Sequence, residues 1–131
     1  MPMVVEASGG GGERACPARR ILVIEDNEAV ANALKRVLEI HHHSVAVAYD
    51  GQTGLDLAAS FAPEVALIDI GLPGMDGHEL ARVLRTQRSI HLVAITGYGD
   101  EADPRSTADF DVYLVKPVGA ARLQAALAAL M

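Results

Sequence analysis

The decisive stretch of this chain reads Val65-Ala66-Leu67-Ile68-Asp69-Ile70-Gly71-Leu72-Pro73-Gly74-Met75-Asp76-Gly77. Its first four residues are all apolar, which is typical of a strand covered on both faces, because a half-exposed strand would alternate apolar and polar residues. The run stops at a carboxylate and enters a turn rich in glycine and proline. Similar short apolar runs occupy residues 21–24, 45–48, 92–95 and 112–115. These five runs predict a buried parallel sheet.

The segments between the runs have helical spacing. The first begins near Asn27 or Glu28, with Asn27 as a candidate N-cap. A weaker helix is expected over residues 101–108, where Pro104 limits it to a short stretch. The apolar stripes are Val30, Ala33, Leu34, Val37 and Leu38; Leu55, Ala58, Ala59 and Ala62; Leu80, Val83 and Leu84; and Ala120, Leu123, Leu127 and Leu130. Alternating strands and helices indicate the α/β class.

Length and composition limit the function classes. The chain has 131 residues, 50% of them hydrophobic, which suits one globular domain. Eleven Lys and Arg against 17 Asp and Glu give a net charge of −6, so direct nucleic-acid binding is not expected. The single cysteine, Cys16, can form neither an internal disulfide nor a cysteine zinc site. With no secretory signal or membrane-length apolar run, we expect a cytoplasmic protein without membrane insertion.

The amino-terminal residues differ in composition from the rest of the chain. Four consecutive glycines, Gly9 to Gly12, predict a flexible Gly-rich tail over residues 1–18, either a functional linker or a gene-start remnant. Residues 19–131 are expected to form the folded domain.

Polar side chains stand where the apolar runs end. They are Glu25, Asp26, Asp69, Thr96 and Lys116. In an open α/β sheet, ligands bind beyond the carboxyl ends of the strands, so these five side chains should converge. Any one of the carboxylates alone could instead be a helix cap or a solvated turn residue.

The predicted cluster has the chemistry of phosphoryl transfer. Three neighbouring carboxylates repel one another, and a divalent cation removes that cost; oxygen ligands favour Mg²⁺, with Mn²⁺ as the alternative. A lysine and a threonine hydroxyl can hold phosphoryl oxygens, and an aspartate can act as nucleophile and form an acyl phosphate.

The chain resembles the receiver domain of two-component response regulators. The stretches that carry the resemblance are residues 21–27, 66–77, 94–99 and 114–118, in the family's order. The resemblance implies a flavodoxin-like (βα)5 fold, a doubly wound five-stranded parallel sheet of strand order 2-1-3-4-5. It also implies a shortened fourth helix, because residues 103–110 lack the longer helix and the Ala-Gly pair that relatives carry before the fifth strand.

The resemblance also implies roles at the site. Asp69 would be the phosphoacceptor, Asp26 would bind Mg²⁺ directly, Glu25 would assist through water, and the Gly71 carbonyl would complete the metal shell. The chain would catalyse its own phosphorylation and dephosphorylation at Asp69 without turning over an external substrate.

Three further positions would respond to the phosphoryl group. Thr96 and Lys116 would contact it, with Lys116-Pro117 in the cis form, and Tyr113 would be the switch aromatic, although β propensity alone could place a tyrosine there. Tyr98 stands where the family tunes phosphate hydrolysis, or is an ordinary loop aromatic.

Two histidine sites outside this cluster have simpler explanations. His41, His42 and His43 could bind a transition metal, but consecutive side chains point apart, and a structural role at a helix end is the better interpretation. His78 is expected at the surface and is not expected to be a phosphodonor.

These observations favour a phospho-accepting receiver. A histidine kinase or histidine phosphotransfer protein would dock near the first helix, and an unknown downstream protein would read the altered surface. The chain could be a stand-alone receiver or the terminal receiver of a hybrid kinase.

Other classes remain open to test. A pseudoreceiver acting as a protein-interaction module without phosphorylation is the alternative that the altered fourth helix suggests. A Mg²⁺-dependent phosphohydrolase would need a substrate-enclosing insertion, which this chain lacks. A dinucleotide enzyme is disfavoured because Gly9 to Gly12 precede the first strand instead of following it.

Overall fold

The computed structural model describes residues 18–97 and 109–130. Five parallel strands form one sheet in the order β3-β2-β4-β5-β6, which is 2-1-3-4-5 along the chain, as predicted. The strands are β2 (Arg20–Ile24), β3 (Ser44–Ala48), β4 (Val65–Asp69), β5 (His91–Thr96) and β6 (Val112–Val115). Each predicted apolar run lies within a strand, with at most one residue added at either end.

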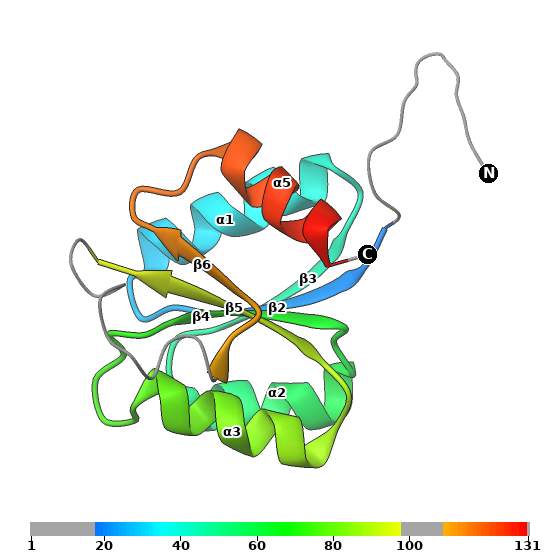
Figure 1. The fold of residues 1–131 in the computed structure, drawn as a ribbon. Coiled ribbons are helices and arrows are strands. Elements are labelled where there is room, and N and C mark those ends of the chain that lie inside the picture. The colour runs from blue at the N-terminus through cyan, green and yellow to red at the C-terminus, as the bar shows by residue number, and fades with distance from the viewer. Residues whose placement is uncertain (1–17, 98–108, 131) are drawn as a thin grey trace.

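Four helices of the described residues cover the sheet. They are α1 (Glu28–Ile40), α2 (Gly51–Phe61), α3 (Gly77–Gln87) and α5 (Ala120–Ala129). Figure 1 shows α1 and α5 over one face and α2 and α3 over the other. The doubly wound α/β fold is therefore confirmed. The weak fourth helix, Tyr98 and almost all of the predicted tail fall outside the described residues.

The side chains on the two faces of the sheet pack into two separate hydrophobic cores. In β2, Ile21 and Val23 pack with α1 and α5, whereas Leu22 and Ile24 pack with α2 and α3. This division follows from the two-residue period of a strand, because successive side chains point to opposite faces. All four residues are fully buried, which is why the run shows no polar alternation.

Local signals set the helix ends. The Asn27 side chain accepts a hydrogen bond from the Val30 N–H at 3.1 Å, so the predicted N-cap of α1 is confirmed. The predicted α2 stripe extends one residue past the helix, which ends at Phe61. Ala62 is exposed and adopts a left-handed conformation, with φ of 53°, as the C-cap that ends the helix. Ala59 is also exposed, whereas the predicted Ala58 is buried together with Gly51 and Gly54.

None of the helices in the described part of the chain has the length and apolar character that crossing a membrane requires.

Candidate functional site

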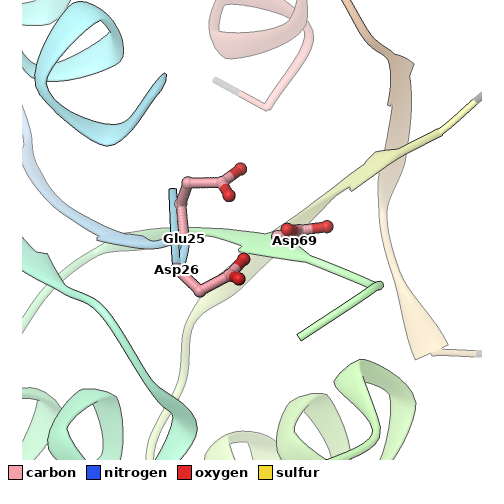
Figure 2. Close-up of side chains that lie close together, drawn as sticks. All are labelled: Glu25, Asp26 and Asp69. Carbon is pink, nitrogen blue, oxygen red and sulfur yellow. The ribbon is translucent and has the colours of Figure 1, made fainter. Parts of the chain in front are cut away.

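Three carboxylates gather at the carboxyl edge of the sheet. Glu25 and Asp26 directly follow β2, and Asp69 is the last residue of the neighbouring strand β4. One oxygen from each lies within 4.8 Å of the others. Figure 2 shows the three side chains close together. Glu25 and Asp69 are buried and Asp26 is exposed, so the cluster opens to solvent on the Asp26 side.

Backbone groups fix the two buried carboxylates. Glu25 Oε2 accepts the Asn27 N–H at 3.0 Å, and Asp69 Oδ1 accepts the Gly71 N–H at 2.9 Å. The Glu25 N–H donates to the Ala48 carbonyl at 3.0 Å, which ties the residue after β2 to the end of β3. The residues after each strand thus hold the carboxylates in place before any ligand binds.

Lys116 supplies positive charge to both buried carboxylates. Its Nζ lies 3.1 Å from Glu25 Oε1 and 3.3 Å from Asp69 Oδ2. Burial by itself would lower the pKa of Lys116, but the carboxylates of Glu25 and Asp69 outweigh it and raise that pKa above its usual range. The lysine therefore stays charged.

At Glu25, in contrast, the effect of burial on the pKa outweighs that of the neighbouring hydrogen-bond donors. Burial raises the pKa of its carboxyl above the ordinary value, and the charge of Asp69 acts in the same direction, against the lowering effects of the Asn27 N–H and Lys116. A cation shared among these oxygens would relieve both the burial and the repulsion.

The donor set suits a hard divalent cation. It consists of carboxylate oxygens on adjacent strand ends, one of them exposed, and this is the ligand type that Mg²⁺ prefers. Among residues 18–97 and 109–130, no other group of three or more acidic, His or Cys side chains is arranged to hold a metal. That the Gly71 carbonyl is a further metal ligand remains a prediction.

Thr96 completes the edge as the last residue of β5. Its carbonyl accepts the Lys116 N–H at 2.8 Å, which links the ends of β5 and β6. Its side chain is fully buried, and Oγ1 has no hydrogen-bond partner among the described residues. A buried hydroxyl without a partner is costly, so Thr96 Oγ1 is suited to a ligand oxygen that arrives later.

The predicted site residues thus come together at one edge. The spatial convergence of Glu25, Asp26, Asp69 and Lys116 is observed directly in their distances. The Lys116-Pro117 peptide bond is cis, as predicted. The chemical role of each residue remains a prediction.

Tyr113 lies on β6, and its hydroxyl oxygen is shielded from solvent. Its ring packs edge to face against Phe110, with ring centroids 5.5 Å apart and an interplanar angle of 80°.

The expectation for His78 was wrong. His78 is fully buried at the start of α3, where Nδ1 lies 2.8 Å from Asp109 Oδ2. The residue that binds it is 31 positions away in sequence, so local spacing gave no signal for its burial.

The histidine run after α1 has a structural contact. His43 is 4% exposed, and its Nδ1 accepts the Arg19 N–H at 3.0 Å. No metal-holding histidine group occurs in the described part of the chain.

An apolar groove of about 480 Å³ lies between α1 and α5, next to the acidic cluster. Four residues of the predicted α1 stripe line the groove, and Leu38 is buried away from it. The four are Val30, Ala33, Val37 and the buried Leu34. Lys116 also lines it, so the groove reaches the candidate site.

Comparisons with known proteins agree with this geometry. Residues 21–128 match the response regulator receiver domain family. The response regulator ArlR of Staphylococcus aureus is 34% identical over 114 residues, which are 86% of this chain and 52% of that protein. The chain therefore spans about half the length of the curated relatives it matches.

Solved structures of receiver domains are also similar. A CheY-like receiver domain protein from Methanospirillum hungatei has a TM-score of 0.79 and 30% identity, covering 87% of this chain and 94% of that one. A CheY-like receiver domain from Methylobacillus flagellatus has a TM-score of 0.81 and 25% identity, covering 88% of this chain and all (100%) of that one.

Proposed function

Because this chain belongs to the response regulator receiver domain family, we propose that Asp69 accepts a phosphoryl group from a histidine kinase or a histidine phosphotransfer protein. The observation that carries the proposal is the setting of Asp69. Its carboxylate lies at the end of a central strand, between the Gly71 N–H and the Lys116 ammonium, beside Glu25 and Asp26. Attack on phosphorus is favoured by an ionised carboxylate that is held in position, with its charge compensated by a nearby cation.

The proposed transfer is a single displacement. A lone pair of an Asp69 oxygen forms the new O–P bond while the P–N bond to the donor histidine breaks. The electron pair of the broken bond returns to the imidazole nitrogen, and an acyl phosphate remains on Asp69.

Mg²⁺ bound by the cluster would neutralise charge on the phosphoryl oxygens. Glu25, Asp26 and Asp69 are the side chains that would hold it, with the Gly71 carbonyl as an added ligand. Mn²⁺ fits the same oxygen set.

The chain's own residues would stabilise the transferred group. Lys116, already 3.3 Å from Asp69 Oδ2, would pair with a phosphoryl oxygen. Thr96 Oγ1 would donate its hydrogen to another phosphoryl oxygen and gain the partner that it lacks among the described residues. Movement of Thr96 toward the phosphoryl group would change the packing of Tyr113 on the next strand, which we propose as the signal.

The groove between α1 and α5 is where the donor protein would dock. The exposed Ala33 and the half-buried Val30 and Val37 give this face an apolar surface beside Lys116, close to the site of transfer. The downstream target would be a protein that distinguishes the two states of the Tyr113 region.

Intact mass tests the proposal. We expect that incubation with acetyl phosphate and Mg²⁺ adds the mass of one phosphoryl group, and that Asp69→Asn abolishes the gain. Asp56→Asn is the matched control, because Asp56 is an exposed aspartate of α2 that contacts Gln52. Mg²⁺ binding without any phosphoryl gain from acetyl phosphate or from a panel of phosphorylated histidine kinases would instead identify a pseudoreceiver.

A further inference from the structure

His78 and Tyr113 are joined by a buried chain of side-chain contacts. We propose that His78 is a positioning residue for Tyr113 and carries changes at Asp69 to that ring by a route that does not pass through Thr96. The part of this inference that concerns Asp69 rests on the proposed function. The part that concerns the position of the Tyr113 ring does not.

The first link fixes the His78 ring. His78 is fully buried, and its Nδ1 lies 2.8 Å from Asp109 Oδ2. A carboxylate can only accept, so Nδ1 carries the hydrogen. Arg82 Nη1 lies 3.1 Å from the same Asp109 oxygen and neutralises it. A buried imidazole held in this way has one orientation.

The second link is aromatic. The His78 ring meets Phe110 edge to face, with centroids 5.4 Å apart and an interplanar angle of 75°. Phe110 meets Tyr113 in the same manner, at 5.5 Å and 80°. Edge-to-face pairs prefer one mutual geometry, so a shift of the first ring is transmitted to the third.

The third link leads back to Asp69. Gly77, the residue before His78, is packed so tightly that a Cβ there would lie 2.9 Å from Ile70 Cα and 3.4 Å from the Asp69 carbonyl oxygen. The His78 N–H also donates to the Asp76 side chain at 2.9 Å. Close-packed backbone transmits displacement, so movement of the residues after Asp69 must shift the start of α3.

A matched contact provides the control. Arg85 Nη2 of α3 lies 2.9 Å from Asp111 Oδ2, so it also joins α3 to the residues before β6. The Arg85–Asp111 contact lies outside the three-ring stack. If His78 merely held α3 to this segment, loss of Arg85 would act in the same way.

Fluorine NMR of the protein labelled with 3-fluorotyrosine measures the Tyr113 environment. The chain has three tyrosines, so Tyr113→Phe assigns the signal. We expect His78→Leu to shift or broaden the Tyr113 signal of the unmodified protein, and Arg85→Gln to leave it in place. His78→Phe, which keeps a ring, should restore most of the wild-type signal.

Asp109→Asn gives a second test if His78→Leu folds poorly. It keeps the imidazole but weakens its anchor, and we expect a smaller shift of the same signal. An unchanged Tyr113 signal in both variants would overturn the proposal, as would an equal shift in Arg85→Gln.

The same samples test the coupling to Asp69. After acetyl phosphate and Mg²⁺, we expect His78→Leu to gain the phosphoryl mass as the wild type does, while its Tyr113 signal moves less. A full wild-type movement in His78→Leu would overturn the proposed route. If the wild type gains no mass, the proposed function fails, whereas the comparison of unmodified proteins still decides whether His78 positions Tyr113.

Discussion

The Lys116 ammonium, directly after β6, lies 3.3 Å from the Oδ2 atom of Asp69 at the end of β4, although the two residues are 47 positions apart. The same nitrogen lies 3.1 Å from Glu25 Oε1. The one ammonium group thus compensates two buried carboxylates. We therefore expect Lys116 and the proposed divalent cation to perform overlapping electrostatic work at this edge.

Replacement of Lys116 should make stability depend more strongly on Mg²⁺. Lys116→Met leaves Glu25 and Asp69 buried without their cation, so we expect the Mg²⁺-free free energy of unfolding to fall by about 1–3 kcal/mol. Saturating Mg²⁺ should restore more stability to the variant than it adds to the wild type. Urea unfolding with Mg²⁺ or with EDTA measures both effects. Arg122→Gln, an exposed position on α5, is the control. An equal Mg²⁺ increment in wild type and Lys116→Met would contradict the shared role.

Thr96→Val should separate stability from signalling. Valine has nearly the shape of threonine and removes a buried hydroxyl that lacks a partner among the described residues, so we expect the free energy of unfolding to rise by about 1 kcal/mol. The response of Tyr113 to beryllofluoride, a phosphoryl mimic, should be reduced, because Oγ1 can no longer donate to it. Chemical denaturation and fluorine NMR measure the two effects. Thr86→Val is the control, since Thr86 Oγ1 donates to the Val83 carbonyl at 2.7 Å and its loss should not stabilise the chain.

Gly77→Ala should destabilise the protein although alanine favours helices. The new Cβ would lie 2.9 Å from Ile70 Cα, and backbone cannot move aside as a flexible side chain does. We expect a loss of about 1–3 kcal/mol, together with weaker Mg²⁺ binding because the residues after Asp69 are displaced. Denaturant titration and calorimetry measure these changes. At Gly119 a Cβ would meet nothing within 4 Å, so Gly119→Ser should change stability by no more than about 0.5 kcal/mol. Equal stability of Gly77→Ala and wild type would show that the backbone at Ile70 shifts at little cost and would contradict this prediction.

Stability should fall as the solution becomes mildly acidic, in part because of His43. Burial lowers the pKa of His43, the positive charges of His41, Arg19 and His42 add to this, and Glu64 opposes it. The unfolded chain, with a histidine pKa of about 6.5, then binds the proton more readily than the folded chain does. The contribution of His43 is therefore fully present above about pH 6.5 and is lost as the pH falls from there through the lowered folded-state pKa.

Protonation would also remove the Nδ1 acceptor that the Arg19 N–H uses at 3.0 Å. Urea unfolding of the wild type and His43→Gln across this pH range measures the contribution, because glutamine keeps an acceptor and does not titrate. Identical pH slopes for the two proteins would assign the loss of stability to other groups.

The sequence was most informative where a residue's neighbours along the chain determine its environment. The run from Ile21 to Ile24 identified a strand with two buried faces, and Asn27 identified the start of α1. The position of Asp69 at a strand end was also predictable, because parallel strands bring their carboxyl ends to one edge. The roles of the site residues came from family resemblance and depend on the experiments above.

What could not be predicted depends on distant partners. His78 follows a glycine at a helix start, which locally indicates a solvated position, yet Asp109 and Phe110 bury it from another part of the chain. Ala62 fits the apolar stripe of α2, but the helix ends there with a left-handed residue. The burial of His78 depends on tertiary contacts, and the end of α2 depends on the backbone conformation of Ala62. The spacing of apolar residues encodes neither.

The parallel arrangement has a practical consequence for biochemical work. All five strands run the same way, so Arg20, the first residue of β2, lies at the edge of the sheet opposite to Glu25 and Asp69. Helix α5 runs back toward that opposite edge (Figure 1). A surface attachment made just before Arg20 or at the end of α5 would therefore leave the acidic edge facing the solution. Immobilised protein should remain open to a large phosphodonor.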